Sequence, residues 1–145
     1  MKPYRVPLHI RFNRIFLRPA FRAIFHILSR IKIIGVENVP PNGPYVVAMN
    51  HISIFDPPFL VSFWKHQPEV IGAAEVFTRK GQSQLLKLYG VIPVHHGEYD
   101  RALLEKILAV LQAGRPPVIA PEGGRSHVTP LPRAKPGLGF IGGQA

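Results

Sequence analysis

Short apolar runs alternate with longer segments of mixed apolar and polar residues along the whole chain. Each run is bounded by Gly, Pro or polar residues and has the length expected of a buried strand. The runs cover residues 31–36, 45–49, 70–74, 90–94 and 117–120. Helical periodicity is predicted over 59–65 and 99–113, and 75–89 is mostly helix or loop. Strands that alternate with helices predict an α/β layered domain, with a mostly parallel sheet flanked by helices.

A long helix is predicted over residues 8–30, with a kink at Pro19. Its arginines are spaced 3, 4 and 4 residues apart, within about 80° of the helical wheel: Arg11, Arg14, Arg18 and Arg22. Most of the remaining circumference is Ile, Phe, Leu and Ala. This pattern favours an amphipathic helix at a membrane interface, with arginines near lipid phosphates and rings in the acyl boundary. The alternative is an ordinary docking helix with a solvated face.

The net charge of +10 and the pI of about 10.6 would suit a nucleic-acid binder. However, residues 1–32 hold eight basic side chains and no acid, and the other 113 residues hold 10 basic and 8 acidic ones. The body is therefore near-neutral, which argues against a nucleic-acid partner. The chain has no apolar run of 18 or more residues, so the sequence predicts no conventional membrane-spanning helix. The absence of Cys excludes a thiol nucleophile and fits a reducing compartment.

The stretch NHISIFD, residues 50–56, carries the first candidate chemistry. It places His51 and Asp56 five residues apart, directly after a predicted buried strand. A carboxylate bonded to one ring nitrogen fixes the imidazole tautomer and leaves the other nitrogen free to take a proton. The pair therefore suits deprotonation of a substrate hydroxyl. A loop histidine capped by a carboxylate at a helix start is the structural alternative.

Two further strand ends carry polar residues. In PEGGRS, residues 121–126, the Gly-Gly pair lets backbone N–H groups approach a ligand, and Arg125 offers a bidentate fork for phosphate. Glu122 could orient that arginine or bond an acceptor hydroxyl, although a tight turn with a surface ion pair would look the same. In GVIPVHHG, residues 90–97, a strand leads into a pair of histidines.

The order and spacing of these stretches resemble the glycerolipid acyltransferases of phospholipid synthesis, whose prototype is the 1-acyl-glycerol-3-phosphate acyltransferase. NHISIFD matches the family's Asn-His-x4-Asp block. GVIPVHHG resembles the second block, Gly-x-Ile-Pro-Val-x-Arg, and APEGGRS resembles the third, Phe-Pro-Glu-Gly-Thr-Arg-Ser. LPRAKPG, residues 131–137, resembles the Phe-Lys-x-Gly segment that follows. The resemblance covers roughly residues 30–140 and rests on three blocks in order.

The resemblance implies that His51 is a general base held by Asp56, and that the acyl group of a thioester passes to a lysophospholipid hydroxyl. Acyl-coenzyme A or acyl carrier protein would be the co-substrate, with no cofactor and no metal. It also implies a peripheral enzyme on the cytoplasmic face of membranes with anionic lipids. The implied substrate-binding residues are Asn50, Ser53, Gly90, His96, Glu122, Gly123, Gly124, Arg125 and Ser126.

The sequence departs from the family pattern at several positions. His96 replaces the arginine of the second block, Gly124 a threonine and Ala120 a phenylalanine. A fourth, later block is absent, which predicts that the catalytic domain over 31–145 is C-terminally truncated. The amphipathic pattern predicts a separate membrane-interface helix over 1–30. Three alternatives stay open: a catalytically inactive membrane-binding fragment, a nucleic-acid binder, and a metal hydrolase that uses His51, Asp56 and His95 or His96.

Overall fold

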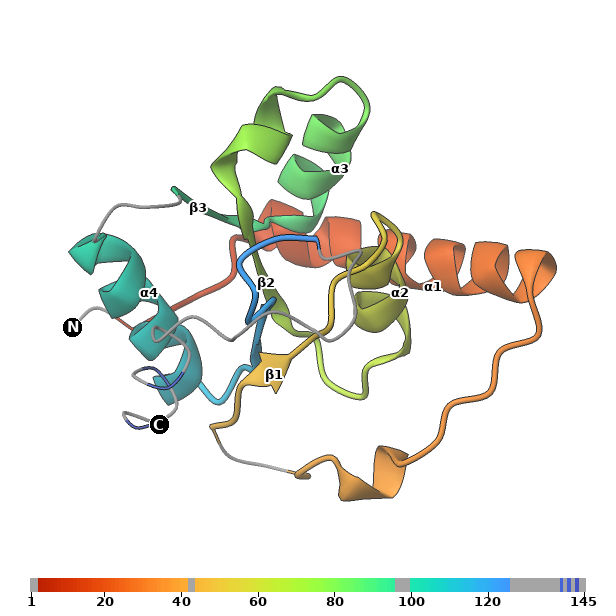
Figure 1. Cartoon of the computed structure of the whole chain (residues 1–145), viewed down its shortest axis with the longest axis horizontal. Coiled ribbons are helices and arrows are strands. Elements are labelled where there is room, and N and C mark those ends of the chain that lie inside the picture. Colours follow the sequence, from red (N-terminus) through yellow and green to blue (C-terminus); the bar gives the residue numbers. More distant parts are fainter. Residues whose placement is uncertain are drawn as a thin grey trace.

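The computed structural model describes residues 3–41, 44–95 and 100–125, together with Gly139, Ile141 and Gly143. Its centre is a four-stranded sheet in the order β1-β4-β2-β3 (Figure 1). The strands are β1 (Val47–Ala48), β2 (Glu69–Ala73), β3 (Ile92–Val94) and β4 (Pro117–Ile119). All three pairings are parallel, so the predicted α/β class with a parallel sheet is confirmed.

Helices cover both faces of this sheet. They are α1 (Leu8–Leu28), α2 (Asp56–Phe63), α3 (Gln82–Tyr89) and α4 (Arg101–Gln112), with short 3-10 helices at Val36–Asn38 and Ala74–Thr78. Side chains alternate across the strands, as the two-residue period requires. Val70 and Val118 pack toward α1, α2 and α3, whereas Ile71 and Ile119 pack toward Ile107 and other residues of α4.

Local signals in the sequence set the helix boundaries. Pro57 and Pro58 lie in the first turn of α2, where a missing N–H costs nothing. The Asp100 side chain caps α4 by accepting from the Leu103 N–H at 3.0 Å. Gly114 follows α4 with a φ of +68°, which favours glycine.

The strand predicted over 31–36 is wrong. Residues 31–35 have no regular structure, and a 3-10 helix begins at Val36. Gly35 has a φ of +82°, which interrupts an extended chain, and Ile33 and Ile34 are exposed. Because this segment pairs with no strand of the sheet, its apolar side chains gain little from an extended conformation.

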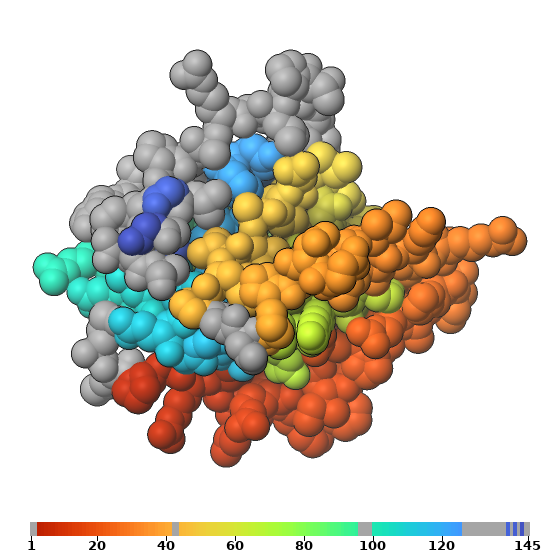
Figure 2. All heavy atoms as spheres, turned by 90° about the horizontal axis from the view of Figure 1, so that it is seen from below, coloured from red at the N-terminus to blue at the C-terminus, as the bar shows by residue number. Residues whose placement is uncertain are grey.

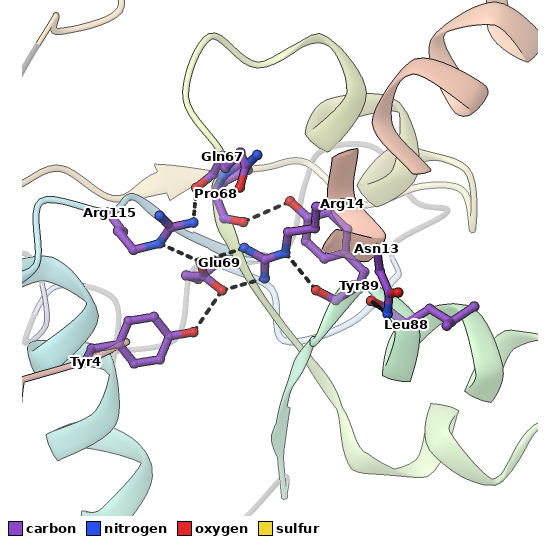
Figure 3. A network of polar contacts seen from close by, with 9 residues as sticks. All are labelled: Tyr4, Asn13, Arg14, Gln67, Pro68, Glu69, Leu88, Tyr89 and Arg115. Carbon is purple, nitrogen blue, oxygen red and sulfur yellow. Dashed lines mark hydrogen bonds and ion pairs between the residues drawn. The ribbon is translucent and has the colours of Figure 1, made fainter. Parts of the chain in front are cut away.

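A buried ion pair holds α1 on the sheet (Figure 3). Arg14 and Glu69 are both 0% exposed and form a bidentate contact at 2.8 and 2.7 Å. Glu69 also accepts from the Arg115 guanidinium at 2.7 Å and the Tyr4 hydroxyl at 2.9 Å. Burial acts to lower the pKa of Arg14, but the hydrogen bonds and charge of Glu69 outweigh it and raise that pKa. Four segments are thus joined through one carboxylate.

Two further arginines of α1 bind the C-terminal end of α2. Arg18 donates to the Val61 carbonyl at 2.8 Å and the Trp64 carbonyl at 2.6 Å, and Arg22 donates to the Ser62 carbonyl at 2.8 Å. These contacts satisfy the last carbonyls of a helix, as cations often do. Three of the four arginines, Arg14, Arg18 and Arg22, therefore contact the protein, which the prediction of a lipid-facing stripe did not include. Arg11 is exposed, and Arg22 also keeps an exposed surface. Spacing showed which side chains share a face, but not what that face meets.

Candidate active site

The loop after β1 brings His51 and Asp56 together. The Met49 N–H donates to the Ile119 carbonyl at 3.0 Å and extends the pairing of β1 with β4. The chain then leaves the sheet, and α2 begins at Asp56. His51 Nδ1 lies 3.2 Å from Asp56 Oδ2, with side chains 19% and 25% exposed. The pair is thus partly buried but open to a ligand.

Backbone donors fix the Asp56 carboxylate. Its Oδ2 atom accepts from the Ile52 N–H at 2.7 Å and the Ser53 N–H at 2.6 Å, in addition to its contact with His51. Its place in the first turn of α2 also suits a negative charge. With Asp56 accepting from Nδ1–H, the His51 Nε2 carries the lone pair. The arrangement can remove a proton from a hydroxyl that approaches Nε2.

The loop after β4 leaves the same edge of the sheet. Val47 pairs with Val118 and Ala48 with Ile119, so the next residues of both strands continue side by side from adjacent parallel strands. His51 and Glu122 each lie three residues beyond the second of these pairs. The structure therefore brings the first and third sequence blocks to one edge, where α/β proteins place their sites.

A tight turn shapes the loop after β4. The Gly123 N–H donates to the Ala120 carbonyl at 2.9 Å, with Gly123 at a φ of +77°. Glu122 Oε2 is buried and has no hydrogen-bond partner among the described residues, which is unusual for a carboxylate oxygen. Gly124 and Arg125 are exposed. The loop therefore combines a buried carboxylate oxygen that has no partner among the described residues with an exposed cation.

The other predicted site residues are placed differently. Ser53 shapes the loop, because its hydroxyl accepts from the Phe55 N–H at 3.2 Å, and Asn50 is exposed at the strand end. Gly90 follows α3 and precedes β3, at the opposite edge of the sheet from His51. A Cβ built on Gly90 would lie 2.8 Å from Ile10, so the structure gives this glycine a packing role.

The second block does not adjoin the first. β4 and β2 both lie between β1 and β3 in the sheet, which separates the ends of β1 and β3 by about 14 Å at ordinary strand spacing. His95 is exposed after β3. His96, Ser126 and the LPRAKPG stretch lie outside the described residues.

The loop between His51 and Asp56 has an apolar surface that the sequence pattern did not predict. Ile52, Ile54 and Phe55 are all exposed, although they lie between the histidine and its carboxylate. The signal was available, because NHISIFD carries three large apolar residues in a predicted loop. Exposed apolar groups at this position can contact an apolar substrate or surface.

Two properties of the described part of the chain bear on the alternatives. No group of three His, Asp or Glu side chains in 3–41, 44–95 and 100–125 is placed to hold a metal ion. None of the described helices combines the length and apolar character that crossing a bilayer requires.

Comparison with protein families gives a match over most of the chain. The family model described as Acyltransferase matches residues 30–145, which is 116 of the 145 residues. The matched span contains both loops at the site edge of the sheet. No solved structure matches the chain.

Proposed function

The chain belongs to the acyltransferase family, and we propose that it moves a fatty acyl group from a thioester to the hydroxyl of a lysophospholipid such as 1-acyl-glycerol 3-phosphate. The observation that carries this proposal is the His51–Asp56 pair, with His51 Nδ1 held at 3.2 Å from a carboxylate that two backbone N–H groups fix. The family supports acyl transfer in general. The substrate class is argued from the loops at the site.

The proposed reaction needs only a base and two substrates. His51 Nε2 takes the hydroxyl proton as the acceptor oxygen attacks the thioester carbonyl carbon. Asp56 stabilises the imidazolium that forms, as the carboxylate of a serine triad does. The tetrahedral intermediate then breaks its C–S bond, and the imidazolium returns the proton to the departing thiolate. The acceptor hydroxyl is the nucleophile, so the scheme has no acyl-enzyme. The thiol is that of coenzyme A or acyl carrier protein.

The loop after β4 would position the acceptor. A phosphate monoester presents oxygens that match the guanidinium fork of Arg125. Glu122 Oε2 is buried and has no partner among the described residues, so it can accept a hydrogen bond from an acceptor hydroxyl. Because this loop and His51 leave adjacent strands, a glycerol phosphate could reach both. Such contacts would supply orientation rather than proton transfer.

The outer face of α1 supports attachment to a membrane. At about 100° per residue, the half of the helix opposite Arg14 carries no Lys, Arg, Asp or Glu. Its exposed large side chains are Leu8, Phe12, Ile15, Phe16 and Ile27. Figure 2 shows α1 lying uncovered along the surface of the molecule. We place this face in the headgroup and acyl boundary of a membrane, peripherally and on the cytoplasmic side where acyl thioesters are made available.

Acceptor-dependent thiol release tests the proposal. Palmitoyl-coenzyme A in detergent micelles is incubated with the protein alone, with lysophosphatidic acid, with lysophosphatidylcholine, or with glycerol 3-phosphate. We expect release that requires lysophosphatidic acid, with a phosphatidic acid product detected in equal amount. Release without any acceptor would indicate a thioesterase and contradict the proposal. Release only with glycerol 3-phosphate would retain acyl transfer but change the acceptor.

A further inference from the structure

A basic groove lies between α1 and the C-terminal end of α2, away from the catalytic loop. Its volume is about 340 Å³, and its walls include Arg18, Arg22 and Lys65 together with Ile15 and Pro19 of α1. No acidic residue lines it. The catalytic Asp56 begins α2, whereas the groove adjoins the other end of that helix, about 11 Å away along its axis at 1.5 Å per residue.

The cations of this groove have no acidic partner among the described residues. Arg14, which also lines it, is neutralised by Glu69. Arg18 and Arg22 donate only to carbonyl oxygens, which carry partial charge. Burial lowers the pKa of Arg18, and the neighbouring positive charges of Arg22 and Arg14 lower it further. Lys65 is exposed at the rim. Three positive charges thus converge with spare N–H donors, and an anion would relieve their repulsion.

The groove also borders the apolar face of α1. Ile15 lies both in the groove wall and on the uncharged outer face. Pro19, which is exposed, follows one helical turn later. A ligand that fits both features carries a phosphate at one end and an apolar chain at the other.

We propose that this groove binds the phosphate-bearing headgroup of an anionic membrane lipid, separately from the acceptor at the catalytic loop. The proposal rests on the membrane attachment of α1 proposed above. The phosphate would lie against Arg18, Arg22 and Lys65, and the acyl chains would follow the outer face of α1 into the bilayer. The contact would fix the rotation of α1 about its axis, and so the orientation of the enzyme on the membrane.

Vesicle co-sedimentation tests this inference. The whole chain is mixed with phosphatidylcholine vesicles and with vesicles containing one-fifth phosphatidic acid. Four proteins are compared: the wild type, Lys65→Gln, the double variant Arg22→Gln/Lys65→Gln, and the control Lys80→Gln. Lys65 and Lys80 are both exposed, but Lys80 lies on the turn before α3 and does not line the groove. Lys65 makes no hydrogen bond among the described residues, so its variant tests the groove without disturbing the fold.

We expect phosphatidic acid to strengthen binding of the wild type. Lys65→Gln should weaken binding to anionic vesicles about fivefold and the double variant about 25-fold, from about 1 kcal/mol per cation. Binding to neutral vesicles should not change, and Lys80→Gln should stay within about twofold of the wild type. An equal loss in Lys65→Gln and Lys80→Gln would mean diffuse attraction and overturn the proposed site.

Two other outcomes separate the proposals. Absence of binding to neutral vesicles would contradict attachment through α1, whereas neutral binding without an anionic preference would overturn the groove alone. Inorganic phosphate at 10 mM serves as the soluble probe. If it raises the melting temperature of the wild type but not of Lys65→Gln, and anionic vesicles show no Lys65 dependence, the groove binds free phosphate and the lipid assignment is wrong.

Discussion

The buried carboxylate of Glu69 should contribute more to stability than any exposed ion pair of the chain. In Glu69→Gln the shape is kept, but Arg14, which is 0% exposed, loses its counter-ion. Breaking a buried pair by removing one partner costs about 3–5 kcal/mol, because the other charge stays buried and uncompensated. For a chain of this size about 2–4 °C of melting temperature corresponds to 1 kcal/mol. We therefore expect Glu69→Gln to melt about 10 °C below the wild type.

Urea denaturation, followed by circular dichroism, measures the corresponding loss in unfolding free energy. Glu105→Gln is the matched control. Glu105 pairs with Arg101 at 2.9 Å, but those side chains are 50% and 80% exposed, so the control should lose less than about 1 kcal/mol. The double variant Glu69→Leu/Arg14→Met removes both buried charges and should be more stable than Glu69→Leu alone. Equal losses in Glu69→Gln and Glu105→Gln would show that the buried carboxylate contributes no more to stability than the exposed one.

Three further predictions concern the site, a close packing contact and pH. Asp56→Asn should lower kcat about 10²–10⁴-fold in thiol release assays with little change in acceptor KM, because the amide no longer holds the histidine in the right tautomer. Gly90→Ala should destabilise the fold by more than Gly114→Ala in denaturant titrations, since both have positive φ but only Gly90 also meets Ile10, at 2.8 Å; equal losses would contradict that contact. Burial raises the pKa of Tyr89 to about 12, so the protonated phenol stabilises the fold below pH 10 and this contribution is lost as the pH rises through 12. Tyr89→Phe should therefore show a shallower fall in unfolding free energy from pH 9 to 12, and an unchanged slope would argue against it.

Local patterns predicted most of the elements but not all of them. Apolar runs located the four strands because each strand supplies buried side chains to the core, including Val47, Val70, Ile92 and Val118. The run over 31–36 has the same composition, yet Ile33 and Ile34 are exposed and unpaired with any strand of the sheet. A strand forms only where an adjacent strand accepts and donates its backbone hydrogen bonds. The sequence of this segment alone does not show whether such a strand lies beside it.

The orientation of α1 could not be read from its own sequence. The 3, 4, 4 spacing correctly placed Arg14, Arg18 and Arg22 on one face. The counter-ion Glu69 lies 55 residues away along the chain, and the carbonyls of α2 lie 40 or more away. Only the tertiary fold decides that this face meets the protein and that the apolar half faces outward.

The sequence could predict only part of the candidate site. The contact of His51 with Asp56 is local, because five residues and a helix start bring the side chains together. Its closeness to Glu122 depends on the pairing of β1 with β4, which joins residues 71 positions apart. The packing of Gly90 against Ile10 is likewise long-range, so a motif match did not reveal it.

In the proposed reaction His51 acts as the base for acyl transfer. The most direct measurement is the rate of thiol release from palmitoyl-coenzyme A with lysophosphatidic acid in micelles, comparing the wild type, His51→Ala and the control His9→Ala. His9 is an exposed histidine on α1, so its replacement should leave the rate unchanged. We predict that His51→Ala lowers the rate at least 10²-fold while its melting temperature stays near that of the wild type. A folded His51→Ala protein that releases thiol as fast as the wild type would show that His51 is not the base.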